Sequence, residues 1–211
     1  MRLTVFGATG GIGREVVAQA LASGHEVTAV VRDPGRLTAS GTGLTVLRRS
    51  DLSDPESLRG ALRGRDAVLS GLGARSRADA GVAARLTRSV LMAMEAEKVR
   101  RLLVVSAAPL GPVPDGQGVL DRAVLAVVNS VLKDVYADLR VMEADLAASG
   151  ADWTSVRPPR LTDKQVTGRY RRVVAGTPPR GRSLARADVA HAMLAMIDDP
   201  ATVRQGVGVA Y

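Results

Sequence analysis

The sequence predicts a doubly wound α/β fold, in which one parallel β-sheet is covered by helices on both faces. Short apolar runs of strand length alternate with helical patterns along the 211 residues. The runs are rich in Val and Leu and lack the polar alternation of a half-exposed strand, so we expect both of their faces to be buried. The first run ends in a glycine-rich turn that leads directly into an amphipathic helix.

Seven runs have the composition of strands, and helical patterns separate most of them. The expected strands are 2–7, 26–31, 44–47, 66–71, 101–106, 152–156 and 207–211. The expected helices are 13–23, 54–62, 84–98, a long one near 119–149, and 186–198. Asp54-Pro55 starts the second helix, and Ser-Gly pairs at 23–24 and 149–150 end two others.

The whole chain, residues 1–211, is expected to form a single domain with a small substrate-side region near its C-terminus. The Pro- and Gly-rich stretch 109–118 resembles a linker in composition. However, strands on both sides of it are needed to complete one sheet. We therefore expect a loop at the carboxyl edge of the fifth strand, where open α/β sheets bind ligands.

Several classes of protein are disfavoured by composition. The chain has no cysteine, which excludes disulfides, thiolate metal sites and a cysteine nucleophile. His25 and His191 are far apart in sequence, so we expect no metal site. The first strand begins next to Met1, and no apolar run reaches the ~18 residues of a membrane span. A cytoplasmic protein that does not enter the membrane is expected.

The formal net charge of +8 is concentrated in one stretch, residues 157–186, which holds nine Lys or Arg and a single acid, Asp163. The rest of the chain is neutral. This stretch has one aromatic residue, Tyr170, and the chain has no helix-turn-helix or finger signature, so we expect no nucleic-acid partner. Two interpretations stay open: drift toward Arg in composition, or a local site for an anion.

The motif "GATGGIG" follows the first strand and places Gly7, Gly10 and Gly13 at the spacing of a dinucleotide-binding turn. Gly7 permits the tight turn, Gly10 allows the main chain to approach a pyrophosphate, and Gly13 allows the helix to pack close to the sheet. A structural turn could also use glycines, but here the motif lies between the first strand and its helix.

The helix that follows would present free N–H groups and a partial positive charge to the phosphates. Gly11 and Ile12 belong to this helix tip, and Thr9 can cap the turn or donate its hydroxyl. The turn and the helix tip therefore predict a dinucleotide cofactor.

The end of the second strand indicates which dinucleotide is bound. NAD sites usually place an acid there for the ribose 2′-hydroxyl, whereas Arg accommodates a 2′-phosphate. Here Arg32 ends the strand and Arg36 lies one turn beyond it. Asp33 could serve an NAD ribose if it pointed inward, and either Arg could be a solvated surface charge. NADPH is preferred over NADH.

The blocks "GATGGIG", "VVRDPGRL", "SDLSDPESL", "DAVLSGLGAR", "VVSAAPL", "SGADWTSVRPPRLTD" and "ARADVAHAML" together resemble the atypical short-chain dehydrogenase/reductase family. The resemblance is to its NmrA-like branch, which contains biliverdin-IXβ/flavin reductase, and it covers nearly the whole chain. It implies a Rossmann-like domain that binds NAD(P)H.

The resemblance also implies positions around the cofactor. Ser106 would face the nicotinamide and is the catalytic candidate. The alternatives are purely structural roles: a plain turn at Gly73, a hydrogen-bonded hydroxyl at the strand end for Ser106, and a rigid loop for the Pro-Pro pair. Adenine would lie between Asp51 and Leu52, ribose and pyrophosphate against Gly73, Ala74 and Arg75, and the carboxamide under Pro158, Pro159, Arg160 and Leu161.

The chain departs from the family at the Tyr-x-x-x-Lys pair that makes a tyrosine an acid or base. Tyr136 and Arg140 have the right spacing, but counting from "EADLAASG" places the family's pair on Val135 and Leu139. Tyr136 is therefore expected to be a helix-surface residue rather than a catalytic one.

Without that acid, an acceptor that forms a stabilised anion, such as a flavin, a quinone or biliverdin, could take its proton from water. We expect a reductase of a small, conjugated, anionic acceptor, working as a monomer or homodimer. Arg160, Arg169, Arg171 and Arg172 could hold the acceptor's anionic groups. The alternative is an NmrA-like redox sensor that binds the dinucleotide without turnover. An epimerase is disfavoured, since it needs the tyrosine base.

Overall fold

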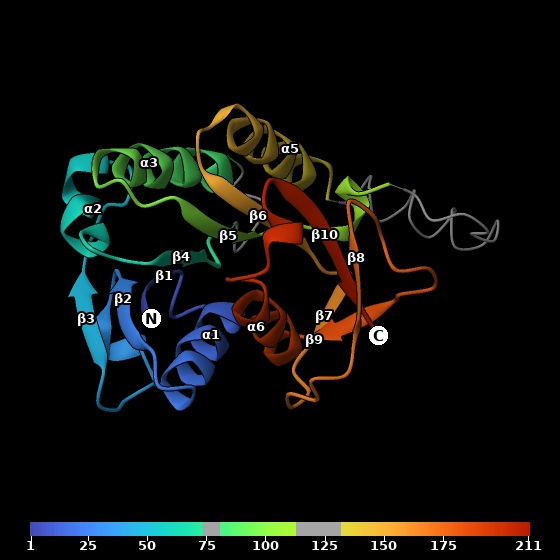
Figure 1. Cartoon of the computed structure of the whole chain (residues 1–211), viewed down its shortest axis with the longest axis horizontal. Helices are drawn as coiled ribbons and strands as arrows, with labels where there is room; N and C mark the ends of the chain where they lie inside the picture. Colours follow the sequence, from blue (N-terminus) through green and yellow to red (C-terminus); the bar gives the residue numbers. More distant parts are fainter. Residues whose placement is uncertain (74–80, 113–131) are drawn as a thin grey trace.

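A computed structural model describes residues 1–73, 81–112 and 132–211 (Figure 1). Its main sheet has eight strands in the order β3-β2-β1-β4-β5-β6-β10-β8. All neighbours in this sheet are parallel except β8, which runs antiparallel to β10. The strands are β1 (Arg2–Phe6), β2 (Glu26–Val31), β3 (Leu44–Arg48), β4 (Ala67–Ser70), β5 (Arg101–Val105), β6 (Asp152–Arg157), β8 (Arg171–Val174) and β10 (Gln205–Ala210).

The helices cover both faces of this sheet, which confirms the predicted doubly wound fold (Figure 1). Leu3 and Val5 of β1 pack toward one face and Phe6 toward the other, so this strand contributes to two cores. On one side lie α1 (Gly11–Ala22) and α6 (Arg186–Ala195), and on the other α2 (Pro55–Leu62), α3 (Val82–Ala96) and α5 (Lys133–Ala148).

The seven predicted strands are all present, within two residues of their expected ends. The long helix expected near 119–149 is described from Lys133 onward, and residues 113–131 lie outside the described part of the chain. Three short strands were not expected. Two of them, β7 (Arg160–Thr162) and β9 (Ser183–Ala185), form a separate parallel pair, and β8 joins the sheet edge.

The order of the first six strands reverses between β1 and β4. The chain winds outward from β1 through β2 to β3, then returns to β4 on the other side of β1. In open α/β sheets, the carboxyl ends of the strands at such a reversal leave a crevice in which ligands bind. The site is therefore expected beyond Phe6 and Ser70, where β1 and β4 end.

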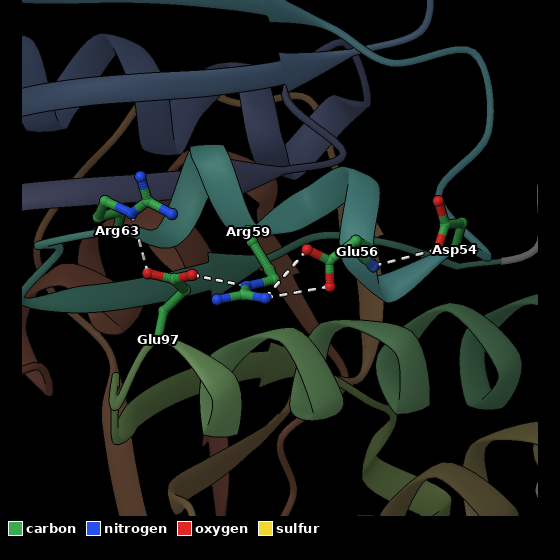
Figure 2. A network of polar contacts seen from close by, with 5 residues as sticks. All are labelled: Asp54, Glu56, Arg59, Arg63 and Glu97. Carbon is green, nitrogen blue, oxygen red and sulfur yellow. Dashed lines mark hydrogen bonds and ion pairs between the residues drawn. The ribbon is translucent and has the colours of Figure 1, made fainter.

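An ion-pair network holds α2 against the end of α3 (Figure 2). Arg59 donates to Glu97 at 2.7 Å and to Glu56 at 2.9 Å, and Arg63 reaches the second oxygen of Glu97 at 3.2 Å. Asp54 caps α2 by accepting from the N–H of Glu56 at 3.1 Å, as the Asp-Pro pair predicted. The network therefore fixes the C-terminal half of α2 against the end of α3, which leads into β5.

The start of α3 is held from α5. The buried carboxylate of Asp138 accepts from the N–H groups of Ala83 and Ala84 at 2.9 and 3.0 Å. Gly81, which precedes the helix, has φ +86°. This cap comes from a residue more than fifty positions away in the chain and satisfies donors at a helix start that would otherwise lack partners.

A second buried carboxylate organises the C-terminal region. Asp188 in the first turn of α6 is fully buried and accepts from the N–H groups of Thr167 and Gly168, both at 2.8 Å. It also accepts from the hydroxyls of Thr167 and Tyr211. Burial alone would raise the pKa of Asp188, but the hydrogen bonds from Tyr211, Thr167 and Gly168 outweigh it and hold that pKa below its ordinary value.

We expect Asp188→Asn to lower the free energy of unfolding at neutral pH and to reduce its acid dependence. Because the pKa of Asp188 is lower in the folded state, its stabilising contribution is complete above about pH 5, and it is lost as the pH falls through the folded pKa. Urea unfolding between pH 7 and pH 3 measures this, with the exposed Glu95→Gln as control. A difference between wild type and variant that stays constant over this range would contradict the prediction.

Candidate functional site

A pocket of about 660 Å³ lies at the crevice between β1 and β4. It is lined by the β1–α1 turn, by the segments at the ends of β2, β3 and β4, by the start of α3, by β7 and by the first residue of α6. Its lining residues are Gly7, Thr9, Gly10, Gly11, Ile12, Val30, Val31, Arg32, Ser50, Asp51, Leu52, Gly71, Leu72, Gly73, Val82, Arg85, Leu86, Leu161 and Arg186.

The β1–α1 turn needs glycine for steric reasons that the structure makes explicit. Gly7 has φ +71°, and a Cβ there would lie 2.8 Å from the carbonyl carbon and oxygen of Gly71. A Cβ on Gly13 would lie 2.1 Å from the carbonyl oxygen of Gly7. Both distances are shorter than real Cβ contacts, so these glycines allow α1 and the end of β4 to approach the turn closely.

The tip of α1 faces the pocket with its backbone. Gly10 is the N-cap residue; its N–H donates to Gly7 at 2.8 Å, and no side chain of the described residues caps the helix. Gly11 and Ile12 form the first turn and line the pocket, as does Thr9. This arrangement provides backbone donors and the positive end of a helix for a phosphate group.

The charged residues predicted at the end of β2 differ in whether they line the pocket. Arg32 is exposed and lines the pocket, whereas Arg36 does not line it. The carboxylate of Asp33 accepts from the N–H of Gly35 at 3.1 Å and caps a short 3-10 turn, Pro34–Arg36. Asp33 is therefore engaged in the local turn, and the group that β2 presents to the pocket is a guanidinium.

Another part of the pocket wall carries the two residues that were expected near an adenine. Leu52 is buried and Asp51 exposed, and both line the pocket. Ser53 donates hydrogen bonds to the carboxylate of Asp51 through its hydroxyl and through its N–H. Both lower the pKa of Asp51, and the hydroxyl has the larger effect. Arg85 and Leu86 of α3 complete this wall. No local motif marks these two residues, because the start of their helix is held by Asp138 of α5.

The remaining predicted cofactor residues divide into three groups. Gly73 and Leu161 line the pocket, while Ala74 and Arg75 lie outside the described residues. Arg160 is exposed on β7 and does not line the pocket. Arg186, which the sequence analysis treated only as part of a basic stretch, does line it and forms an ion pair with Asp163 at 2.7 Å.

Ser106 and the Pro158-Pro159 pair lie at the same edge, one and two strands beyond β4, outside the lining of the pocket. The N–H of Ser106 donates to Val156 at 2.8 Å, and that of Ala108 to Pro158 at 2.9 Å, which joins the two strand ends. The Oγ of Ser106 is buried and makes no hydrogen bond of ordinary geometry within the described part of the chain. It is available for a ligand group at this edge.

A partly buried ion pair lies beside Ser106 and was not expected from the sequence. Arg157 at the end of β6 donates to Glu143 of α5 at 3.0 and 2.7 Å, and Ser155 donates to the same carboxylate at 2.6 Å. Burial raises the pKa of Glu143, but the hydrogen bonds from Arg157 and Ser155, with a smaller contribution from Ser106, outweigh it and lower that pKa. The carboxylate of Glu143 is therefore ionised at neutral pH, and its hydrogen bonds join α5 to the end of β6 beside Ser106.

Tyr136 does not form a catalytic pair with Arg140. Its side chain is 7% exposed and packs in the core beneath α3 and α5 rather than on the helix surface, whereas Arg140 is exposed. Burial raises the pKa of Tyr136, the opposite of the change that makes a tyrosine a useful acid or base near neutral pH. Neither residue lines the pocket.

Much of the basic stretch 157–186 has partners within the protein. Arg172 pairs with Asp199 at 2.7 Å, and Arg171 donates to the carbonyls of Pro179 and Tyr211. These two are therefore poorly placed to hold an acceptor. Arg160 and Arg169 are exposed and have no carboxylate partner among the residues that the structure describes.

The pocket suits an extended anionic ligand. Its floor is main chain at the glycine turn, and its charged walls carry Arg32, Arg85 and Arg186 against one acid, Asp51. In the described residues no group of three or more His, Asp or Glu is arranged to hold a metal ion. The same residues contain no helix with the length and apolar character needed to cross a membrane.

Two curated proteins have similar sequences. One is (4-alkanoyl-5-oxo-2,5-dihydrofuran-3-yl)methyl phosphate reductase from Streptomyces griseus, 32% identical over 156 residues, which are 74% of this chain and 46% of that protein. The other is the isoflavone reductase homolog IRL of Zea mays, 38% identical over 87 residues, which are 37% and 28% of the two chains. The matched part of the chain thus spans less than half the length of either relative.

Solved structures share the whole fold. A wide-type short-chain dehydrogenase/reductase from Veillonella parvula in complex with NADP has a TM-score of 0.81 and 20% identity, over 100% of this chain and 94% of that one. A Streptococcus pneumoniae protein whose proposed activity is that of an NADH-flavin reductase has a TM-score of 0.82 and 22% identity, over 100% and 99%. At these identities the likeness shows the fold alone.

The family is shown by a family model rather than by any single relative. The model described as NAD(P)H-binding matches residues 7–200, from the first glycine of the β1–α1 turn to the end of α6 and beyond. The match includes every described segment that lines the pocket. The chain belongs to this NAD(P)H-binding family.

Proposed function

We propose that the protein is an NADPH-dependent reductase that transfers hydride to a small, conjugated, anionic acceptor. The observation that carries the proposal is the pocket itself, which is lined by a glycine turn, by a helix tip without a side-chain cap and by Arg32. The glycine turn fits a pyrophosphate, and Arg32 at the end of β2 fits a ribose 2′-phosphate. Asp33 is the acid that would favour NADH, but its carboxylate accepts a hydrogen bond from Gly35 within its own turn.

The curated relatives support a reductase that acts on an oxygenated, conjugated compound. Both are named as a reductase or the homolog of one, and the name of the Streptomyces protein describes a substrate with an oxo-dihydrofuran ring and a methyl phosphate. A phosphate on the acceptor would match the exposed cations Arg160 and Arg169. The resemblance to biliverdin-IXβ/flavin reductase supports flavins and biliverdin as further acceptors of the same kind.

Bound NADPH would supply the hydride. The chain's own contribution is to hold the dinucleotide against the turn at Gly7–Ile12 and to present its reactive end toward Ser106 and Pro158. The buried hydroxyl of Ser106, which makes no hydrogen bond of ordinary geometry within the described residues, would donate one hydrogen bond that orients the nicotinamide or the acceptor. Because Tyr136 is in the core, the acceptor takes its proton from water.

Oxidation of NADPH by an acceptor panel tests this function. We expect consumption, followed at 340 nm, above the protein-free rate with at least one of FMN, riboflavin, menadione and biliverdin. Tight NADPH binding without consumption of NADPH by any conjugated acceptor, including phosphorylated dihydrofuranones, would contradict the reductase and support the NmrA-like sensor. Heat-denatured protein is the control for reduction without a site.

Arg32→Gln should distinguish the two dinucleotides. Losing a charge-assisted contact to the 2′-phosphate should weaken NADPH binding by about 10- to 100-fold and leave NADH binding within about 2-fold. Arg36→Gln is the matched control, because Arg36 lies one turn away and outside the pocket lining. Calorimetric titration gives both dissociation constants. Equal loss for NADPH and NADH would show that Arg32 does not recognise the 2′-phosphate.

The double substitution Arg160→Gln/Arg169→Gln tests the anionic acceptor. It should raise the KM for FMN several-fold and leave the KM for riboflavin, which has the same ring without the phosphate, unchanged. The Kd for NADPH should also be unchanged. Equal effects on the two flavins would exclude these cations as the phosphate contact.

A further inference from the structure

Arg186 lies directly on the tip of α1, in a space that a glycine leaves open. A Cβ built on Gly11 would lie 2.6 Å from Cδ and 2.8 Å from Nε of Arg186. Any larger residue at position 11 would therefore displace this side chain. The glycines of the turn were expected to serve a dinucleotide, but the structure shows that Gly11 makes room for an arginine.

The main chain on both sides of this contact is fixed. Gln19 of α1 donates through Nε2 to the carbonyl of Ala187 at 2.9 Å, which ties α1 to the first turn of α6. The residue before Arg186, Ala185, ends β9, where it lies opposite Thr162 of β7. Arg186 therefore reaches the pocket from a backbone position held by α1 on one side and by the β7–β9 pair on the other.

Positive charge is in excess around Arg186, which favours an anionic ligand there. Its guanidinium is placed in the pocket against the positive end of α1, and Arg186 itself occupies the first position of α6, where the helix dipole also disfavours a cation. Its ion-pair partner is Asp163, at 2.7 Å, whose side chain is 73% exposed. An exposed carboxylate is a weak and exchangeable partner.

We propose that Arg186 binds the pyrophosphate of the dinucleotide, and that a phosphate oxygen replaces the carboxylate of Asp163 as its partner. A phosphate at the tip of α1 would meet backbone N–H groups from one side and a forked guanidinium from the other. Asp163 then competes with the cofactor for Arg186 and lowers its affinity. This inference rests on the proposed use of NAD(P)H and adds a residue and a competing ion pair to it.

The test compares Arg186→Gln with Asp163→Asn, using ADP-ribose as the probe because it carries the pyrophosphate without a 2′-phosphate. Arg186→Gln should weaken ADP-ribose binding about tenfold or more, and Arg186→Lys should recover part of the loss. Asp163→Asn should tighten ADP-ribose binding, since it removes a competitor. Adenosine 2′-phosphate, which lacks the pyrophosphate, should bind all three variants like the wild type.

A purely structural ion pair predicts a different pattern, in which both substitutions weaken binding of both probes equally. That result, or an Arg186→Gln variant that binds ADP-ribose like the wild type, would overturn the inference. Failure of the proposed function is separate: the wild type would then bind neither NADPH nor ADP-ribose, or would bind NADPH without reducing any acceptor. Matched melting temperatures confirm that the variants fold.

Discussion

The close approach of three main-chain segments at the carboxyl edge of β1 is the constraint on which the site depends. The turn after β1, the start of α1 and the end of β4 meet at Gly7, Gly13 and Gly71. An added Cβ on Gly7 or Gly13 would overlap backbone atoms, and one on Gly71 would lie 3.3 Å from the backbone nitrogen of Gly13. This contact aims the uncapped tip of α1 into the crevice between β1 and β4. With bulkier residues there, α1 would be displaced, and the backbone donors at its tip would be lost to the pocket.

The fold was predictable because its signals are local. Each signal can be recognised within a few residues, as in the apolar runs of strand length, the Asp54-Pro55 helix start and the glycine turn. The structure contains all of them. Strands β7, β8 and β9 were missed because they are three or four residues long and rich in arginine or small residues, so their pairing is set by tertiary context.

The candidate site was predictable only in part, for a related reason. The residues of the glycine turn, Arg32, Asp51, Leu52 and Leu161 belong to sequence blocks, and the structure brings them together in one pocket. Arg85 and Arg186 reach the same pocket through contacts made far along the chain, such as the cap from Asp138 and the space above Gly11. One local signal did exist for Arg186, namely a cation at the first position of a helix.

The central claim is that the dinucleotide lies across the glycine turn and against the tip of α1. Backbone amide chemical shifts, recorded while NADPH is titrated into the folded protein, test it most directly. We expect the largest saturable changes at Gly10, Gly11 and Ile12, with further changes at Gly71–Gly73. An absence of saturable changes, or changes confined to the other helix layer or to β8, would contradict the account.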